Sequence, residues 1–404
     1  MSELSYLEKL LDGVEVEWLP LGEVSALRRG RVMSKGYLTE NFGPYPVYSS
    51  QTANNGKIGS INTFDFDGEY ISWTTDGANA GTVFYRTGKF SITNVCGLIT
   101  LKSKCPLIYK FLFYWLTIEA KKHVYSGMGN PKLMSHQVEN IPVPIPCPDN
   151  PEKSLAIQSE IVRILDKFTA LTAELTAELN MRKKQYNYYR DQLLSFKEGE
   201  VEWKTLGEIG KWYGGGTPSK NKIEFWENGS IPWISPKDMG RTLVDSSEDY
   251  ITEEAVLQSS TKLIPANSIA IVVRSSILDK VLPSALIKVP ATLNQDMKAV
   301  IPHENILVKY IYHMIGSRGS DILRAAKKTG GSVASIDSKK LFSFKIPVPN
   351  INEQQRIVEI LDKFDTLTNS ITEGLPREIE LRQKQYEYYR DLLFSFPKPE
   401  TVSN

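Results

Sequence analysis

Hydrophobic side chains recur at helical spacing over two long stretches of the chain. In the first stretch the intervals alternate between three and four residues, with one extra interval of four, as in a helix that packs along another helix. The seam is formed by Ile157, Ile161, Ile164, Phe168, Leu171, Leu175, Leu179, Arg182, Tyr186, Tyr189, Leu193 and Phe196. Asp149-Asn150-Pro151-Glu152 has the composition of a helix start. We therefore expect a helix of about 40 residues, roughly 60 Å long.

The second stretch, from Asn352 to Phe396, repeats this seam. It differs in its middle, where Gly374 and Pro376 stand at positions that would otherwise be helical. Because proline removes a backbone donor and glycine weakens a helix, we expect a break or kink at this point.

The two helical stretches belong to a repeat of the whole chain. The segment 16–18 (VEW) recurs at 201–203, ILDKF at 164–168 recurs at 360–364, and the run 181–196 recurs at 381–396. Tyr6–Leu11 also resembles Tyr189–Leu194, so the N-terminus carries the tail of a repeat whose beginning is missing. This arrangement predicts approximate twofold symmetry, with antiparallel helices and chain ends that meet.

Between the repeated segments lie two stretches that differ in sequence but share a pattern. Short β-branched and aromatic runs such as Glu69–Thr74 and Ser268–Val273 predict strands, and the apolar runs from Leu107 and Leu307 predict helices. The fold class expected is α+β: two pseudo-symmetric globular α/β domains separated by two long antiparallel coiled-coil helices. The boundaries expected are an N-terminal segment completing the repeat at 1–18, the first globular domain at 19–146, a central helical spacer at 147–203, the second globular domain at 204–345 and a C-terminal helical spacer at 346–404.

Several motifs of the chain point to one family. Gly214-Gly215-Gly216-Thr217-Pro218-Ser219 is followed by Ile231-Pro232-Trp233-Ile234-Ser235 and by Asn294-Gln295-Asp296-Met297, and the helices carry ILDKF, a Tyr-Tyr-Arg-Asp run and the duplication TAEL-TAEL at 172–179. With these motifs, nearly the whole chain resembles the specificity (S) subunits of type I restriction-modification systems, most of all those of the IC group.

The resemblance implies a division of labour between subunits. The two globular domains would be target-recognition domains, each reading one half of an asymmetric, split DNA site, while the helices would set the spacing and bind two methyltransferase (M) subunits. Restriction (R) subunits would complete the nuclease. The chain itself would be no enzyme and bind no cofactor, since S-adenosylmethionine belongs to the M subunit and ATP and Mg to the R subunit.

The TAEL duplication has a physical consequence of its own. Four helical residues add about 6 Å and a net rotation of only about 40°, so one block lengthens the spacer while nearly preserving the side that it faces. With base pairs stacked roughly 3.4 Å apart, removing one block should change the gap between the half-sites by one or two base pairs.

The net charge is small but unevenly distributed. Lys and Arg number 48 against 47 Asp and Glu, a net charge of +1 that by itself argues against a uniformly basic DNA-binding protein. The stretches 19–146 and 204–345 each carry +5, however, and the remainder carries −9. We therefore expect the two variable domains to meet DNA phosphates and the acidic helices to avoid them.

Candidate DNA contacts are basic and amide side chains in the polar loops of the two domains, because forked donors read guanine and amides read adenine. For any one of them a solvated surface role is the alternative. In the first domain they are Arg28, Arg29, Arg31, Gln51, Asn54, Asn55, Lys57, Lys121, Lys122, Asn130, Lys132, His136 and Gln137; in the second they are Lys220, Lys237, Arg241, Arg274, Lys327 and Lys328. The lysine pairs 121–122 and 327–328, each before a glycine turn, fit phosphate contacts better than base contacts.

Catalytic and metal-binding motifs are missing from the sequence. It has no HExxH, no GxSxG, no Cys/His cluster and no P-loop lysine after Gly214–Gly216, which we expect to form a tight turn. Three cysteines form no disulfide framework, and the longest apolar run, Leu107–Ile118, is too short to cross a membrane. We expect a cytoplasmic DNA-specificity subunit. The alternatives are a coiled-coil adaptor that binds no nucleic acid and a methyltransferase with a fused specificity region.

Overall fold

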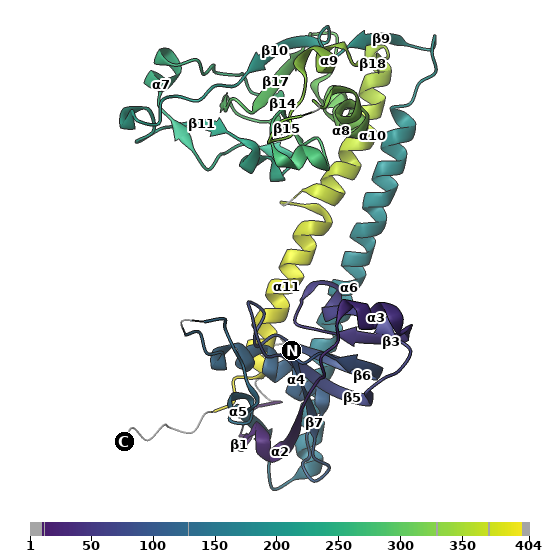
Figure 1. Cartoon of the computed structure of the whole chain (residues 1–404), viewed down its shortest axis with the longest axis vertical. Helices are drawn as coiled ribbons and strands as arrows, with labels where there is room; N and C mark the ends of the chain where they lie inside the picture. The colour runs from purple at the N-terminus through teal and green to yellow at the C-terminus, as the bar shows by residue number, and fades with distance from the viewer. Residues whose placement is uncertain (1–9, 12, 128, 329, 371, 398–404) are drawn as a thin grey trace. The chain divides into compact units, whose positions relative to one another are not determined.

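The structure is a computed structural model that describes residues 10–11, 13–127, 129–328, 330–370 and 372–397 (Figure 1). The chain divides into two compact units. Unit 1 comprises residues 1–174 and 380–404, and unit 2 comprises residues 175–379. Each unit contains one of the two variable stretches together with parts of both helical stretches. Tyr6–Leu11, the fragment that resembles the repeat tail, lies outside the described residues except for its last two positions.

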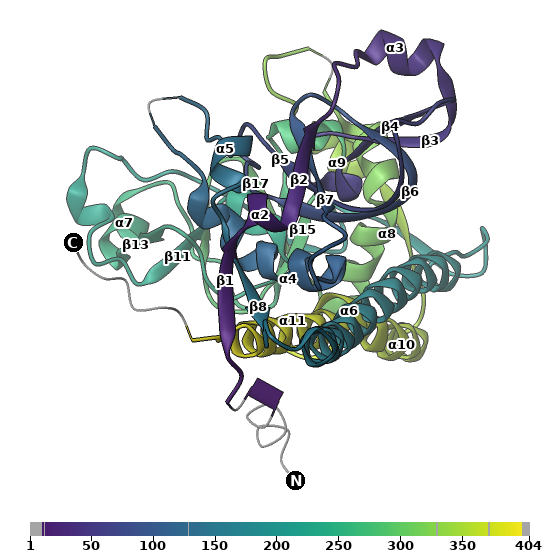
Figure 2. The ribbon, with the colours of Figure 1, turned by 90° about the horizontal axis from the view of Figure 1, so that it is seen from below.

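Unit 1 is built around a six-stranded sheet. Its strand order is β2-β7-β5-β6-β3-β4, and β1 and β8 form a separate antiparallel pair (Figure 2). The strands are β1 (Val16–Pro20), β2 (Ser25–Arg29), β3 (Phe42–Tyr48), β4 (Lys57–Ile61), β5 (Phe66–Thr74), β6 (Val83–Ile92), β7 (Cys96–Leu101) and β8 (Pro142–Pro146). The helices are α2 (Leu21–Val24), α3 (Lys35–Glu40), η1 (Ala53–Gly56), α4 (Tyr109–Glu119), η2 (Ala120–His123) and α5 (Ser135–Val138).

The core of unit 1 lies between the sheet and α4. Trp73 and Ile99 of the sheet are fully buried together with Phe111 and Leu112 of α4. Burial of such apolar surface is the main stabilising term, at about 25 cal/mol per Å². The predicted strand at Glu69–Thr74 and the predicted helix in the run from Leu107 are both present.

Unit 2 divides its strands between larger and smaller sheets. The strand orders are β10-β17-β14-β15-β12 and β13-β11-β16, and β9 pairs with β18. The strands are β9 (Glu202–Thr205), β10 (Gly210–Gly214), β11 (Ile231–Ile234), β12 (Leu243–Val244), β13 (Tyr250–Ile251), β14 (Ser268–Val272), β15 (Ser284–Ile287), β16 (Thr292–Leu293), β17 (Met297–Pro302) and β18 (Lys345–Val348). The shorter helices are η3 (Ile223–Phe225), η4 (Pro236–Gly240), α7 (Glu253–Gln258), η5 (Ser276–Asp279), α8 (Val308–Ala326) and α9 (Ser338–Ser343).

The two units share a backbone scaffold despite their different sequences. The antiparallel trio β2-β7-β5 of unit 1 corresponds to β10-β17-β14 of unit 2. Each unit also has a short parallel pair, β3 with β6 in unit 1 and β11 with β16 in unit 2. The residue after each pair donates its backbone N–H to the last carbonyl oxygen of the neighbouring strand: Thr93 to Tyr48 and Asn294 to Ile234, each at 2.9 Å. The segments Pro46–Ser49 and Pro232–Ser235 therefore occupy equivalent places.

The long helices follow the predicted pattern. The helix α6 (Pro151–Leu193) is unbroken over 43 residues, whereas the second copy is split into α10 (Ile351–Asn369) and α11 (Gly374–Leu393). Gly374 has φ +80°, and a Cβ at this position would come within 2.5 Å of the carbonyl oxygen of Thr366. Because only glycine adopts this conformation without strain, the helical break falls where the sequence predicts it.

Each unit contains one antiparallel pairing of the helical segments. In unit 1 Phe168 of α6 stacks on Tyr389 of α11, with ring centroids 5.3 Å apart. In unit 2 Phe364 of α10 stacks on Tyr189 of α6 at 5.7 Å. The same phenylalanine of one repeat thus meets the same tyrosine of the other repeat in both units, as expected for twofold-related antiparallel helices.

The described parts of the two chain ends meet in unit 1. The Trp18 indole N–H donates a 2.9 Å hydrogen bond to the carbonyl oxygen of Pro397. Val14 and Phe394 are buried in one apolar cluster, and Leu206 and Leu194 are buried together in unit 2. The C-terminal segment therefore completes the first domain as the end of α6 completes the second.

None of the described helices is long and apolar enough to cross a membrane.

Candidate nucleic-acid interface

Polar side chains of unit 1 gather where β2, β3 and β5 end. The guanidinium of Arg29, the last residue of β2, donates to the carbonyl oxygen of Asn94 at 2.9 Å and to Thr75 Oγ1 at 3.2 Å. The Thr93 hydroxyl donates to Ser49 Oγ at 2.9 Å and so joins the turn between β6 and β7 to the segment after β3. Three strand ends therefore meet at one polar edge of the sheet.

The loop 49–57 forms the exposed part of this edge. Asn54 and Asn55 are exposed and have φ values of 51° and 53°, a left-handed conformation that asparagine tolerates better than most residues. The Gln51 side-chain amide donates to the carbonyl oxygen of Lys57 at 2.5 Å and so closes the loop. The amides of Asn54 and Asn55 have the paired donor and acceptor that read adenine, whereas the N–H of Gln51 is engaged within the protein.

The segment around Lys132 lies beside the same edge. The Gly77 N–H, just after β5, donates to the carbonyl oxygen of Pro131 at 3.0 Å, and Asn130 and Lys132 are exposed. Lys121 is also exposed, and its backbone lies against Gly81. The structure thus joins five predicted contacts into one surface, the unit 1 edge: Arg29, Asn54, Asn55, Asn130 and Lys132, with Lys121 nearby.

Other predicted residues of the first domain have partners within the protein. Arg31 forms an ion pair with Asp65 at 3.0 Å and donates to the Tyr37 hydroxyl at 3.2 Å. Hydrogen bonding to Tyr37 raises the pKa of Arg31 against the opposing effect of burial. Lys122 pairs with the buried carboxylate of Glu119 at 2.8 Å. These two cations are less available for DNA than the sequence alone indicates.

Three further side chains of the first domain have distinct placements. Gln137 accepts from the Met134 N–H and donates to the carbonyl oxygen of His123, so its amide caps α5. Arg28 is exposed on β2 and, by strand alternation, lies on the opposite face from Arg29. His136 is exposed within α5.

Unit 2 presents a corresponding edge built on the glycine segment 214–217 and on the turn after β16. The Gly216 N–H donates to the carbonyl oxygen of Leu293 at 2.8 Å, and the Thr217 hydroxyl hydrogen-bonds Gln295 Oε1. A Cβ on Gly215 would come within 1.7 Å of the carbonyl oxygen of Asn294, so this close approach requires glycine. The predicted tight turn is not found at the glycine run, because Gly214 ends β10 and residues 215–219 carry no turn and no glycine with positive φ. The Gly-Gly-Gly-Thr-Pro motif instead lets the backbone pack closely against Asn294–Met297.

Arg274 and Lys328 lie beside the turn after β16. The Arg274 N–H donates to the carbonyl oxygen of Asp296 at 3.3 Å. Arg274 also forms an isolated antiparallel β-bridge with Ser335. The carbonyl oxygen of Ser335 accepts from the Lys328 N–H at 2.8 Å. Both side chains are exposed, as is Lys220 beyond the glycine run. Thr217, Gln295, Arg274 and Lys328 form the unit 2 edge.

Three predicted cations of unit 2 have acidic partners. Lys237 lies 3.6 Å from Glu248 and 3.9 Å from Asp249. The other two pairs are Lys327 with Asp279 at 2.7 Å and Arg241 with Asp245 at 3.3 Å. Arg241 also lies apart from the residues of the unit 2 edge. It lines a pocket of about 360 Å³ together with Tyr186 of α6 and Asp365 of α10.

Sequence reasoning missed the side chains that hold these edges. Asp238 of η4 is buried and accepts from the backbone N–H groups of Ser235 and Glu248 at 2.8 and 2.9 Å. The Ser-x-x-Asp spacing of a capping box could have revealed it. Arg86 and Asn79 hold the loop 49–57, through hydrogen bonds to the carbonyl oxygens of Asn55 and Ser50. No sequence signal distinguishes Arg86 from an exposed strand residue.

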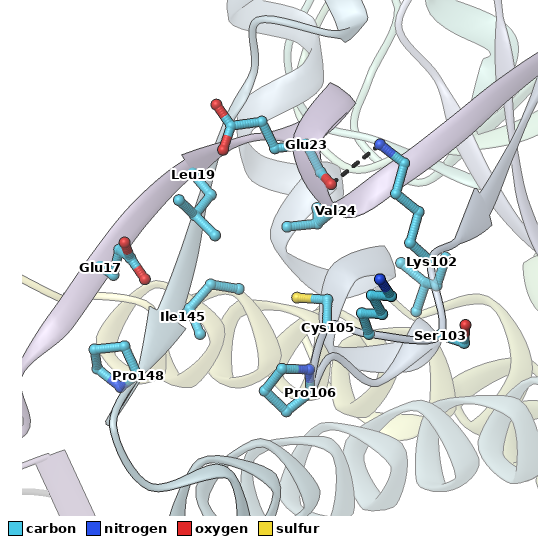
Figure 3. A pocket seen from close by; sticks show the side chains of 12 residues that line it. Glu17, Leu19, Glu23, Val24, Lys102, Ser103, Cys105, Pro106, Ile145 and Pro148 are labelled. Atoms are coloured by element: carbon cyan, nitrogen blue, oxygen red, sulfur yellow. Dashed lines mark hydrogen bonds between the residues drawn. The ribbon is translucent and has the colours of Figure 1, made fainter.

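A pocket of about 730 Å³ lies elsewhere on unit 1, beside β1 and β8 (Figure 3). Figure 3 shows Glu17 and Glu23 on its rim and Lys102, whose Nζ donates to the backbone oxygen of Glu23 at 3.1 Å. A pocket of about 820 Å³ in unit 2 includes Glu202, the repeat counterpart of Glu17. The first pocket is lined by two glutamates and two lysines and the second by three glutamates and one lysine, so neither offers the excess of positive charge that favours phosphates. Among the described residues no cluster of three or more His, Cys, Asp or Glu side chains could hold a metal ion.

Comparison with known proteins defines the class. The family described as "Type I restriction modification DNA specificity domain" matches the chain twice, over residues 13–182 and 198–381. The chain therefore belongs to the specificity subunits of type I restriction-modification systems. In this class the subunit supplies recognition to a multi-subunit complex and is not its catalytic component.

Individual relatives agree with this assignment. The chain is 72% identical, over its full length and the full length of the relative, to the "Type I restriction enzyme EcoR124I/EcoR124II specificity subunit" of Escherichia coli. It is 37% identical to the EcoprrI specificity subunit of Escherichia coli, with 92% of this chain and 93% of the relative covered. The fold also resembles the crystal structure of an S subunit from M. genitalium, with a TM-score of 0.59 at 18% identity and 96% and 98% of the two chains covered.

Proposed function

We propose that the unit 1 edge and the unit 2 edge each read one half of an asymmetric, bipartite double-stranded DNA site. The observation that carries this proposal is that equivalent sheet edges in the two units present different polar side chains. Unit 1 offers Arg29, Asn54 and Asn55, whereas unit 2 offers Gln295 and Arg274. Both edges combine amides, which pair with adenine, with a guanidinium, which pairs with guanine, but in different numbers and on different segments of the frame, so the two edges would recognise different half-sites.

The cations at each edge support DNA binding by a second route. Lys121 and Lys132 in unit 1 and Lys220 and Lys328 in unit 2 are exposed. Such side chains neutralise phosphates and release counterions, which supplies affinity without sequence information. Reading of bases and binding of phosphates are thus carried by different residues of the same edge.

The long helices would set the spacing between half-sites and dock two methyltransferase subunits. The reciprocal stacking of Phe168 on Tyr389 and of Phe364 on Tyr189 supports twofold equivalence, which suits two copies of one partner. Restriction subunits would join this assembly in the cytoplasm. S-adenosylmethionine would bind the methyltransferase subunits, and ATP and Mg the restriction subunits.

Methylome sequencing tests the function directly. Cells that carry this chain with its methyltransferase partner should show methylation at one split motif with two different halves. A continuous motif, or no methylation that depends on the chain, would contradict the proposal. Purified chain alone should transfer no methyl group from S-adenosylmethionine, whereas a methyltransferase with fused specificity region would.

The adaptor alternative is separated by a DNA-binding assay. The complex with methyltransferase subunits should shift random-sequence DNA at low salt and release it as salt rises, because phosphate contacts dominate non-specific binding. A complex that assembles normally but shifts no DNA would favour the adaptor. The modest charge of each variable domain predicts that the isolated chain binds weakly at physiological salt.

Deletion of one TAEL block, Thr176–Leu179, tests the role of α6 as the spacer. The deletion shortens the helix by about 6 Å. The methylated motif should keep both halves and lose one or two base pairs between them. Methylation at the original spacing would contradict the assigned role of the helix.

A further inference from the structure

A buried arginine lies against the loop 49–57. Arg86, on β6, is only 3% exposed. Its Nε donates to Ser72 Oγ at 3.0 Å, and its Nη1 donates to the carbonyl oxygen of Asn55 at 2.8 Å. The guanidinium carbon lies 3.6 Å from the ring centroid of Tyr48 and 4.5 Å from that of Phe84. Two hydrogen bonds and two aromatic rings therefore fix the guanidinium in one orientation.

This cation has no acidic partner within the described part of the chain. Burial lowers the pKa of Arg86 to about 10, and the groups that oppose this effect are Tyr48 and Cys96 rather than a carboxylate. Arginine is rarely buried without a counter-ion, because the charge loses its hydration. An apolar residue would fill the same strand position at lower cost, so the guanidinium needs a reason to be there.

The conformation of the loop supplies that reason. Asn54, Asn55 and Gly56 are three consecutive residues with positive φ, at 51°, 53° and 80°. L-residues adopt this conformation reluctantly, so the loop needs fixed contacts to keep it. Arg86 binds the backbone at the second of these three residues, and the Asn79 amide binds the carbonyl oxygen of Ser50 at 2.9 Å.

We propose that Arg86 is a positioning residue that holds the loop 49–57 in the shape that presents the Asn54 and Asn55 amides to adenine edges in the major groove. Arg86 thereby determines specificity for one half of the target without touching a base. This inference rests on the proposed function, in which the unit 1 edge reads DNA. The uncompensated charge next to the loop also attracts the phosphates that flank the bases.

The test uses the complete complex with methyltransferase subunits and three variants. Arg86→Met removes the two hydrogen bonds. Arg86→Lys keeps the charge but loses the planar fork that donates to Ser72 and Asn55 at once. Lys89→Met is the matched control, because Lys89 lies on the same strand, is exposed and carries the same charge. Methylome sequencing identifies the half-sites, and competition between duplexes measures discrimination at each base.

Both Arg86 variants should lose about tenfold or more of the discrimination at one half-site, the order of magnitude carried by one well-formed base contact. The other half-site and the spacing should be unchanged. The double variant Asn54→Ala, Asn55→Ala should relax the same base positions. Lys89→Met should leave discrimination at both half-sites as in the unchanged chain.

Folding is checked in the same unit. Cys96 is 3% exposed and burial raises the pKa of its thiol to about 11, so it should resist alkylation while unit 1 stays folded. If Arg86→Met fails this check, Arg86→Lys and the Asn54, Asn55 double variant carry the test. The double variant changes exposed side chains, and Asn54→Gly, Asn55→Gly repeats it with residues that tolerate positive φ, so that loss of the amides is separated from strain in the loop.

Several results would overturn the inference. They are full discrimination in Arg86→Lys, equal relaxation of both half-sites in the Arg86 variants, and unchanged half-sites in the Asn54, Asn55 double variant. If the unchanged chain directs methylation at a split motif and the Arg86 variants keep the same discrimination at both half-sites, this inference alone is refuted. Absence of any split motif with the unchanged chain refutes the proposed function instead.

Discussion

The segments that follow β3 in unit 1 and β11 in unit 2 occupy equivalent places but are held by side chains of opposite charge. The buried Arg86 donates to the loop backbone in unit 1, whereas the buried Asp238 accepts from it in unit 2. The sheet scaffold and the strand-end hydrogen bonds are common to both units. The repeat therefore preserves the sheet frame of the two units and leaves the side chains at their edges free to differ, as the proposed asymmetric DNA target would require.

The exposed side chains around Arg86 in unit 1 and around Asp238 in unit 2 also differ in charge. In unit 1 the loop beside Arg86 exposes the uncharged amides of Asn54 and Asn55. In unit 2 Lys237, next to Asp238, lies near Glu248 and Asp249. Exposed charge in the second loop is thus partly neutralised within the protein. We expect unit 1 to depend more on loop shape and unit 2 more on Gln295 and Arg274.

The largest effect is expected from removal of the acidic anchor. Asp238→Ala leaves the N–H groups of Ser235 and Glu248 without acceptors, which should cost about 3 kcal/mol of the free energy of unfolding. Urea unfolding of the chain measures this loss. Asp245→Ala, an exposed neighbour, is the control and should cost less than about 1 kcal/mol. Equal losses in the two variants would show that Asp238 is no anchor.

A smaller effect is expected where the helices meet the domains. In unit 2 the Asp362 carboxylate accepts from Lys309 at 2.5 Å and from His313 at 3.0 Å; in unit 1 Asp166 accepts from Lys110 and Tyr114 at 2.5 and 2.6 Å. Asp362→Asn and Asp166→Asn should each cost about 1 kcal/mol at neutral pH, because these carboxylates are partly exposed and screened. A large difference between the two variants would break the symmetry of this contact.

The Asp362 contact also has a pH signature. Burial alone would raise the pKa of Asp362, but hydrogen bonds from His313 and Lys309 outweigh burial and lower it. A carboxylate with a lowered pKa in the folded state stabilises above its unfolded value of about 3.9, and this contribution is lost as pH falls below that value. The difference in unfolding free energy between the unchanged chain and Asp362→Asn should shrink below pH about 4. A difference as large at pH 3 as at pH 7 would contradict this account.

Salt dependence of DNA binding compares a free cation with a paired one. Lys132 is exposed, and no ion pair involves it in the part of the chain that the structure describes, whereas Lys237 has two acidic neighbours. Affinity for DNA falls as salt rises, so the slope of log affinity against log salt is negative. Lys132→Ala should reduce the magnitude of this slope by about one, the value for one lost phosphate contact. Lys237→Ala should lower it by less than half as much. Titration of the methyltransferase complex on random DNA gives both slopes, and the reverse order would refute the distinction.

The smallest effect is expected for Arg31. Its exposed ion pair with Asp65 should contribute less than about 1 kcal/mol to stability and keep the guanidinium from phosphates. Arg31→Ala should leave the salt slope unchanged, with Arg29→Ala as the comparison on the same polar edge. A slope change as large as that of Lys132→Ala would place Arg31 on the DNA.

The architecture could be predicted because the repeat constrains long-range contacts. Phe168 and Phe364 occupy equivalent positions of the repeat, and so do Tyr189 and Tyr389. If the two copies are related by a twofold axis, a contact of Phe168 with Tyr389 implies the reciprocal contact of Phe364 with Tyr189, as in an antiparallel helix pair. The broken second helix was likewise predictable, because Gly374 acts through local backbone geometry. These features depend on sequence separation and periodicity, which a single chain displays.

The site was predictable only in part, since exposure and pairing depend on residues far apart in the sequence. Arg31 meets Asp65, and Lys327 meets Asp279 across 48 positions. No local pattern marks those pairs. Arg86 stands in an alternating strand, where either face could be buried, so its burial becomes visible only when Tyr48 and Phe84 are placed around it.

The central claim is that the two edges read the two half-sites independently. Its most direct test is methylome sequencing of three strains, carrying the unchanged chain, the Asn54→Ala, Asn55→Ala double variant and Gln295→Ala, each with the same methyltransferase partner. We predict one split motif in which the first variant relaxes one half and Gln295→Ala relaxes the other, with the spacing unchanged. Relaxation of the same half by both variants, or of both halves by either, would contradict the claim.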